Sequence, residues 1–91
     1  MLVAQEMEIE VLPNPAYDKA AIRFFSPEEQ YVVVKIYDLN GKIVELLHQQ
    51  YAMKGWNQTE FYPNNLSSGI YFVSVQMKDA IRTERLVVSG E

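Results

Sequence analysis

Hydrophobic and polar residues alternate with a period of two along most of this chain, as in β-strands that bury one face. The segment from Tyr31 to Tyr37 gives the strongest signal, because it is dense in β-branched and aromatic residues. Within it, Val32, Val34 and Ile36 fall on one face. Similar segments, separated by turn residues, predict seven strands at about residues 6–11, 20–25, 31–37, 42–50, 56–62, 70–77 and 80–88.

The residues between these segments are turn formers. Pro13 and Pro15 end the first strand, because a proline nitrogen cannot donate to a strand ladder. The sequence Asp38-Leu39-Asn40-Gly41 predicts a hairpin in which Asn40-Gly41 tolerates the positive φ of such turns. Turn signals every ~8–12 residues, without convincing helical periodicity, predict an all-β sandwich.

The segment 42–50 is less regular than the others. Ile43 and Leu47 fall on one parity, whereas Val44 and Leu46 fall on the other. This pattern predicts either a β-bulge or a strand that is buried on both faces.

Composition narrows the class of protein. The length of 91 residues suits one domain, close to the roughly 100 residues of a small sandwich, and a hydrophobic fraction of 48% argues against disorder. There is no cysteine, so stability does not depend on redox state, and the antibody-type Cys…Trp…Cys pattern is excluded. A net charge of −4 with scattered basic residues disfavours nucleic-acid binding. No apolar stretch approaches the roughly 20 residues of a membrane span, so we expect no membrane insertion.

No catalytic, metal-binding or cofactor-binding constellation stands out in the sequence. His48 lacks a Cys or Asp partner at a suitable spacing, so we expect an ordinary residue on a strand surface. The segment that starts at Asp38 superficially resembles a calcium loop, but Lys42 occupies the fifth position, where an oxygen ligand is needed. We therefore expect no catalytic residue, no metal and no cofactor.

The aromatic residues leave one binding function open. An exposed cluster of them would form a platform on which sugar rings stack, although core and turn packing explains most aromatics in so small a domain. The candidates for this platform are Tyr37, Tyr51, Trp56, Phe61 and Tyr62.

Five motifs follow one another in a fixed order. They are Pro13-Asn14-Pro15, the hairpin sequence from Ile36 to Lys42, Gly55-Trp56, the sequence Leu-Ser-Ser-Gly-Ile-Tyr-Phe-Val from Leu66 to Val73, and Arg-Leu-Val-Val from Arg85 to Val88. In order and spacing they resemble the C-terminal sorting domain of proteins exported by the bacterial type IX secretion system, over about residues 9–88. Two departures are Arg85, where many members of that family have lysine, and the acidic tail Ser89-Gly90-Glu91.

The resemblance implies a seven-stranded immunoglobulin-like β-sandwich at the C-terminus of a larger secreted protein. The outer-membrane translocon would recognise the folded domain in the periplasm, and a sortase-like peptidase would then remove it as the N-terminal cargo domain reaches the cell surface or the medium. The domain would be a substrate of this machinery and not an enzyme. We expect residues 1–5 to be a disordered or added segment, residues 6–89 to form the sorting domain and residues 90–91 to be a tail.

The resemblance also marks individual positions. They are Pro13, Asn14, Pro15, Asp38, Gly41, Lys42, Gly55, Leu66, Gly69, Tyr71 and Arg85. Most have an ordinary structural explanation, since glycines permit turns, Asx side chains cap them, and Leu66 and Tyr71 are expected to pack inside. Lys42 and Arg85 are the better candidates for direct contact with the machinery, and the terminal strand offers an edge for β-augmentation.

Two other functions remain open from the sequence. One is a non-catalytic accessory sandwich of an extracellular hydrolase, which binds carbohydrate or acts as a spacer. The other is an assembly module similar to the immunoglobulin-like domain of the flagellar hook cap.

Overall fold

The structure, a computed structural model that describes residues 8–89, contains seven strands and one short 3₁₀ helix within that range. Six of the strands begin and end within two residues of their predicted segments; the first was predicted from residue 6, is described from Glu8 onward and begins at Ile9. The strands are β1 (Ile9–Leu12), β2 (Ala20–Ser26), β3 (Gln30–Tyr37), β4 (Ile43–Ala52), β5 (Gly55–Phe61), β6 (Gly69–Gln76) and β7 (Ile81–Val88). The 3₁₀ helix η1 (Pro63–Asn65) follows β5, where Pro63 ends the strand. The segments predicted at residues 1–5 and 90–91 lie outside the described residues.

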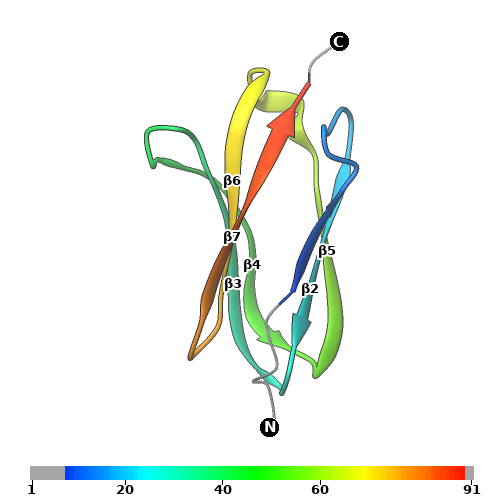
Figure 1. Cartoon of the computed structure of the whole chain (residues 1–91), viewed down its shortest axis with the longest axis vertical. Helices are drawn as coiled ribbons and strands as arrows, with labels where there is room; N and C mark the ends of the chain where they lie inside the picture. Colours follow the sequence, from blue (N-terminus) through cyan, green and yellow to red (C-terminus); the bar gives the residue numbers. More distant parts are fainter. Residues whose placement is uncertain (1–7, 90–91) are drawn as a thin grey trace, which may run out of the picture.

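The strands form two antiparallel sheets that pack face to face (Figure 1). Sheet A has the strand order β1-β2-β5, and sheet B has the order β4-β3-β6-β7. The predicted seven-stranded immunoglobulin-like sandwich is therefore confirmed. Its fourth strand pairs with β3 in sheet B, whereas a constant-type immunoglobulin domain places the fourth strand in the sheet of the first, second and fifth strands.

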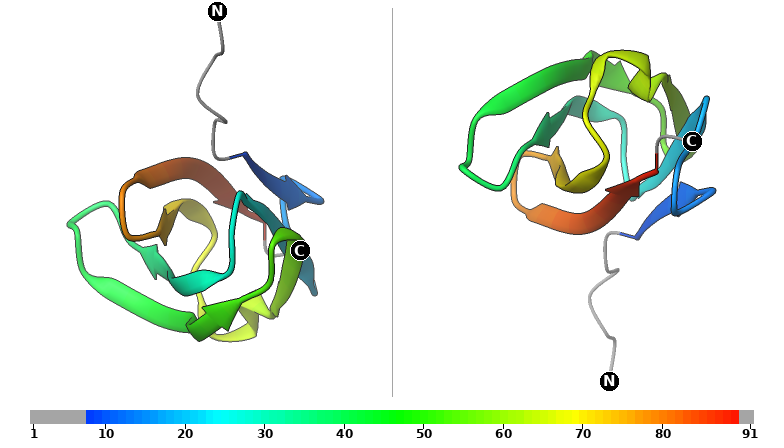
Figure 2. Two further views of the ribbon diagram at one scale, coloured as in Figure 1. Left: turned by 90° about the horizontal axis from the view of Figure 1, so that it is seen from below. Right: turned by 90° about the horizontal axis from the view of Figure 1, so that it is seen from above.

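The core lies between the sheets, and the alternation of the sequence generates it directly. Val32, Val34 and Ile36 of β3 are fully buried, as the period of two predicts. From sheet A, the alternate residues Ile22 and Phe24 of β2 face them and are also fully buried. Figure 2 shows the two layers in end view, with the core space between them.

The irregular pattern of the fourth strand corresponds to breaks in its pairing with β3. The register shifts between Val34 and Lys35 and again between Ile36 and Tyr37, so β4 has an extra residue at each place. These bulges allow Val44 and Leu47, which differ in parity, both to pack against the core. The predicted bulge is confirmed.

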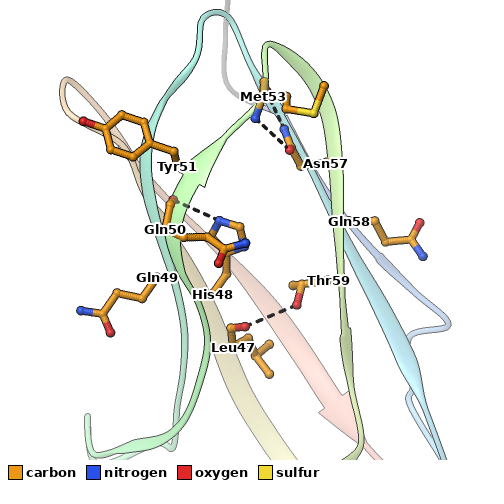
Figure 3. A pocket seen from close by; sticks show the side chains of 9 residues that line it. All are labelled: Leu47, His48, Gln49, Gln50, Tyr51, Met53, Asn57, Gln58 and Thr59. Carbon is orange, nitrogen blue, oxygen red and sulfur yellow. Dashed lines mark hydrogen bonds between the residues drawn. The ribbon is translucent and has the colours of Figure 1, made fainter.

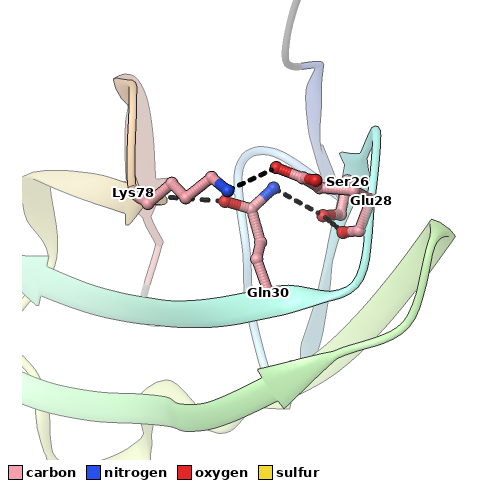
Figure 4. A network of polar contacts seen from close by, with 4 residues as sticks. All are labelled: Ser26, Glu28, Gln30 and Lys78. Carbon is pink, nitrogen blue, oxygen red and sulfur yellow. Dashed lines mark hydrogen bonds and ion pairs between the residues drawn. The ribbon is translucent and has the colours of Figure 1, made fainter.

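A polar network ties the two sheets together at the lower end of the sandwich (Figure 4). The buried Gln30 side chain donates from Nε2 to Ser26 Oγ over 3.1 Å and accepts at Oε1 from the backbone N–H of Lys78 over 3.1 Å. Lys78 Nζ lies 3.0 Å from Glu28 Oε2. Buried polar groups are costly when they are unpaired, and here Ser26 and Gln30 satisfy each other.

Candidate functional site

The predicted motif residues gather at one end of the sandwich, with a single exception. The β1–β2 connection, the β3–β4 turn, the β5–β6 connection and the last residues of β7 all lie at the upper end in Figure 1. We call this surface the motif end and define it as residues 13–17, 38–42, 62–71 and 85–89. The exception is Gly55, which lies in the β4–β5 turn at the opposite end.

Asn14 connects the first motif to the last through its side chain. Its Nδ2 donates to the carbonyl oxygen of Arg85 over 2.9 Å, and its Oδ1 accepts from the backbone N–H of Val87 over 2.9 Å. The amide of Asn14 thus imitates one residue of a neighbouring strand at the outer edge of β7. The two motifs are 71 residues apart in sequence, and this contact joins them.

The residue after the Pro-Asn-Pro motif, Ala16, extends this contact with the edge of β7. We call the contact of Asn14 and Ala16 with β7 the seam. Ala16 is fully buried, its N–H donates to the carbonyl of Val87 over 2.7 Å, and its carbonyl accepts from Ser89 N–H over 2.8 Å. A parallel bridge pairs Ala16 with Val88. Ala16 could not be predicted from the sequence, because a lone alanine carries no motif signal. The hint that the sequence offered is its position after two prolines, which forbid a regular strand.

The β3–β4 turn is built around the Asp38 carboxylate. Its Oδ1 accepts from the backbone N–H groups of Asn40 and Lys42, each over 2.9 Å, and Gly41 N–H donates to the Asp38 carbonyl over 3.0 Å. Gly41 has φ +82°, as predicted, because the residue after a type I turn in such a hairpin must adopt the left-handed conformation. The side chain of Asp38 therefore shapes the turn, which is the behaviour of an Asx residue.

The fourth motif lies beside this turn. Tyr71 is largely buried, its hydroxyl donates to the Ser67 carbonyl over 2.8 Å, and Leu66 packs against the core. A shallow hollow of about 200 Å³ separates the two turns. Its lining comes from Asp38, Leu39, Asn40, Ser68, Gly69, Ile70 and Tyr71. The second and fourth motifs thus share one surface, as sequence spacing alone could not show.

A larger open groove of about 580 Å³ completes the motif end. It lies between the β1–β2 connection, the η1 region and the last residues of β7. Its lining residues are Tyr17, Asp18, Pro63, Asn64, Leu66, Val88 and Ser89. Tyr62, beside it in sequence, donates from its hydroxyl to Glu60 Oε1 over 2.9 Å, and this bond raises the pKa of Tyr62 because the carboxylate favours the neutral phenol.

Three cations outside the motif end have carboxylate partners, whereas two cations within it have none among the described residues. Lys19, Arg23 and Lys78 each pair with a carboxylate. Within residues 8–89, no ion pair or hydrogen bond engages the side chains of Lys42 and Arg85, although both residues are exposed. Their side chains are therefore free to meet a partner, whereas the carbonyl of Arg85 and the N–H of Lys42 are already used within the fold.

The five aromatic residues proposed as a sugar platform do not form one. Phe61 is buried in the core at 1% exposure. Trp56 contacts Phe25 with ring centroids 5.7 Å apart, while Tyr51 contacts Tyr31 at 5.6 Å on the other sheet. The sequence could not show this separation, because residues on β4 and β5 are close along the chain but belong to different sheets.

A cleft of about 400 Å³ lies between β4 and β5, yet its lining points in different directions (Figure 3). Three of the lining side chains point away from the space between the strands: Gln49, Tyr51 and Gln58. The side chain of Asn57 is already bonded, because its Nδ2 donates to the Met53 carbonyl over 2.9 Å. His48 is half-buried, not simply on the surface as expected: it packs edge-on against Phe24 at 5.5 Å. Over the described residues, no three His, Cys, Asp or Glu side chains group together as a metal site would need.

Comparisons with known proteins agree with this architecture. A family model described as the secretion system C-terminal sorting domain matches residues 10–89. The crystal structure of dimeric latent PorU from Porphyromonas gingivalis is similar, with a TM-score of 0.76 and 19% identity, over 93% of this chain and 9% of the PorU chain. At that identity the likeness shows the fold alone. The comparison with curated proteins gave no match. No helix in the range 8–89 is long and apolar enough to cross a membrane.

The matched region contains all four segments of the motif end, from Pro13 to Ser89. A match over nearly the whole length of the chain, together with the sandwich that carries it, settles the family. This chain belongs to the C-terminal sorting domains of the type IX secretion system.

Proposed function

We propose that the outer-membrane translocon recognises this domain through the motif end and so exports the larger protein that carries it. Type IX sorting domains mark proteins that are secreted or reach the cell surface, and such a domain interacts with the secretion system as part of a cargo polypeptide. The observation that carries the proposal is the contact of Asn14 with β7, because it joins the first and the last motif of the sequence into one surface. A receptor that recognises a folded domain needs such a surface rather than a linear peptide.

The motif residues then divide into two roles. Asn14, Asp38 and Tyr71 form bonds within the fold, so they act by shaping the surface. Lys42 and Arg85 carry charge with no partner among the described residues, so they act by contact. Charged groups at the rim of an interface steer association and set specificity.

The remaining parts of the pathway are part of the same proposal, which membership in the family supports. The cargo domain precedes the sorting domain, whose limits we place at residues 6–89, and a sortase-like peptidase removes the sorting domain at the cell surface. The sorting domain itself is non-catalytic. The chain spans only 9% of the PorU chain that it matches.

A fusion experiment tests the proposal. A fluorescent protein with a periplasmic signal is joined to the N-terminus of this chain and expressed in a type IX-competent host and in a host that lacks the translocon. We expect fluorescence at the surface or in the medium only in the competent host. A folded fusion that stays in the periplasm of both hosts would contradict the proposal.

Variants of the same fusion separate the two roles. Lys42→Ala and Arg85→Ala should reduce the exported fraction while thermal stability stays that of the parent. Lys54→Ala is the matched control, since Lys54 is an exposed lysine outside the motif end, in the β4–β5 turn. Equal export of all three variants would show that the two motif cations make no contact.

A further inference from the structure

The outer face of sheet B carries exposed apolar side chains on all four of its strands, among a few polar ones. Side chains of residues paired across an antiparallel ladder lie on the same face, so the register maps this face directly. Outward positions include Tyr31 opposite Tyr51, and Tyr37 opposite both Ile43 and Phe72. Six large hydrophobic residues on this face are exposed, from 38% to 68%: Tyr31, Ile43, Leu46, Tyr51, Ile70 and Ile81. Val33, Tyr37 and Phe72 between them are only half-buried.

The outer face of sheet A has a different character. Arg23 there is held by Glu10 at 2.6 Å, and its guanidinium carbon lies 4.6 Å from the centre of the Trp56 ring. Lys19 and Glu60 add an ion pair beside them. Polar groups on sheet A thus satisfy one another, as expected of a face that remains in water.

The charges on the sheet B face have one sign. Lys35 and Arg85 are the charged residues at the outward register positions of the described strands β3, β4, β6 and β7. Neither forms an ion pair within residues 8–89, although the whole chain carries a net charge of −4. Glu45 and Glu84 on these strands pair in register with the inward-facing Ile36 and Val73. Acidic residues are therefore absent from the outward positions.

We infer that the outer face of sheet B is a second docking surface, whose occupant is a protein of the secretion machinery with an apolar surface that carries carboxylates opposite Lys35 and Arg85. The two cations lie roughly 12 Å apart, by the spacing and rise of strands. A large apolar patch on a small domain marks an interaction site, and unpaired cations within it select a partner of opposite charge.

The same charges argue against two other occupants. A second copy docked face to face would place cations against cations, and like charges across an interface oppose association. An anionic lipid surface would gain little from two cations on a chain whose net charge is −4. The inference rests on the sorting function, and it adds the face and the chemistry of the partner.

The test uses the fluorescent fusion with substitutions on each face. On sheet B, the variants are Lys35→Glu and, separately, Leu46→Asp; Arg85 stays unchanged, because it also belongs to the motif end. The matched controls are Lys54→Glu, which changes the net charge equally, and Leu12→Asp, since Leu12 is 54% exposed on sheet A and Leu46 is 50% exposed on sheet B. Thermal unfolding of each purified domain shows which variants keep the parent fold.

We expect each sheet B variant to reduce the exported fraction about tenfold and each control less than twofold. A photo-crosslinking residue at position 72 should form an adduct with a machinery protein only in the competent host, and one at position 58 should form none. Export of folded sheet B variants at the parent level, while the parent is exported, overturns this inference alone. Failure of the parent to be exported overturns the proposed function instead.

Two measurements on the unmutated domain test the two other occupants, a second copy of the chain and a membrane surface. If the unmutated domain sediments as a dimer and Leu46→Asp abolishes the dimer, the occupant of this face is a second copy of the chain. If the domain floats with vesicles of anionic lipid and Lys35→Glu/Arg85→Glu abolishes the flotation, the occupant is a membrane surface. Either result overturns the inference, whereas a monomer that does not float is the expected outcome.

Discussion

The two long sides of the sandwich are closed in different ways. On the β1–β7 side, the Asn14 amide and the Ala16 backbone make four hydrogen bonds to the strand edge between Arg85 and Ser89. On the β4–β5 side, the contact across the gap is a weak one, from Thr59 Oγ1 to the Leu47 carbonyl at 3.5 Å. An exposed strand edge invites pairing with other chains, so this protein covers one edge with a motif and disrupts the other with bulges.

The comparison explains why the Pro-Asn-Pro motif is built as it is. The prolines lack N–H groups, so they leave no orphan donors beside β7. Asn14 supplies the missing donor and acceptor from its side chain. Below this seam, residues 81–85 of β7 are exposed, and Arg82 and Glu84 stand at inward-facing register positions, a device that discourages edge pairing. β-Augmentation at this edge, which the sequence left open, stays a prediction.

Breaking the closed side should have the largest effect. Asn14→Leu removes both side-chain bonds to β7 and should lower the free energy of unfolding by about 2 kcal/mol, at about 1 kcal/mol for each bond. Urea denaturation of the purified domain measures this change. Asn64→Leu, a change at an exposed asparagine of the same end, is the control and should stay within about 0.5 kcal/mol of the parent. A loss below that value for Asn14→Leu would mean that the seam does not stabilise the fold.

The turn that leads into the open side should be the next most sensitive. Gly55 has φ +102°, and an added Cβ would meet no atom within 4 Å, so Gly55→Ala tests backbone conformation alone. We expect a loss of about 1 kcal/mol by thermal or urea unfolding, because L-residues disfavour this region. Gln58→Ala on the same strand is the control. Unchanged stability of Gly55→Ala would show that the turn relaxes to negative φ.

The bridge across the open side should matter least among these contacts. Thr59→Val keeps the β-branched shape and removes only the long bond to Leu47, so the loss should be under about 0.5 kcal/mol. The measurement is the urea midpoint of this variant beside that of Asn14→Leu. If the two losses were equal, the open side would be as firmly closed as the seam.

A pH titration probes the ion pair of Lys78 with Glu28, which lies at the lower end of the sandwich and belongs to neither long side. The hydrogen bond and the charge of Glu28 raise the pKa of Lys78 above 10.5, its ordinary value. A raised folded-state pKa gives stability that is complete below the unfolded pKa and is lost as the pH rises through the folded one. Lys78→Met should therefore flatten the alkaline decline of the melting temperature slightly, because the pair is exposed and screened.

Tyr62 titrates in the same range, with its pKa raised by Glu60, so the variant must be compared with Tyr62→Phe. Both groups lose their stabilising contribution in the same direction as the pH rises. An alkaline decline that Lys78→Met leaves unchanged would show that the tie to Glu28 does not form in solution.

Much of the fold was predictable because it depends on local rules. The period of two in β3 placed Val32, Val34 and Ile36 in the core, and the Asn40-Gly41 pair located a hairpin with positive φ at Gly41. The conflicting parities of Val44 and Leu47 indicated bulges. In each case, a few neighbouring residues decide the outcome.

The candidate site was predictable only as a set of positions. The sequence marked Asn14 and Arg85 separately, but it could not show that the amide of one binds the carbonyl of the other across 71 residues. It marked Gly55 as one more position, and only the fold shows that Gly55 lies at the end opposite to the other motifs. The half-burial of His48 against Phe24 was missed because it depends on a strand from the other sheet.

The sequence by itself determined the strands, the turns, the core parity and, through its five motifs, the family. Only the tertiary structure decided that β5 pairs with β2 in sheet A, that hydrogen bonds close one long side of the sandwich while the other stays open, and that the exposed hydrophobic residues of four strands share one face. Local periodicity specifies which face of a strand is apolar, because side chains alternate along the backbone. The choice between sheets depends on long-range pairing, in which strands far apart in sequence compete for the same edge.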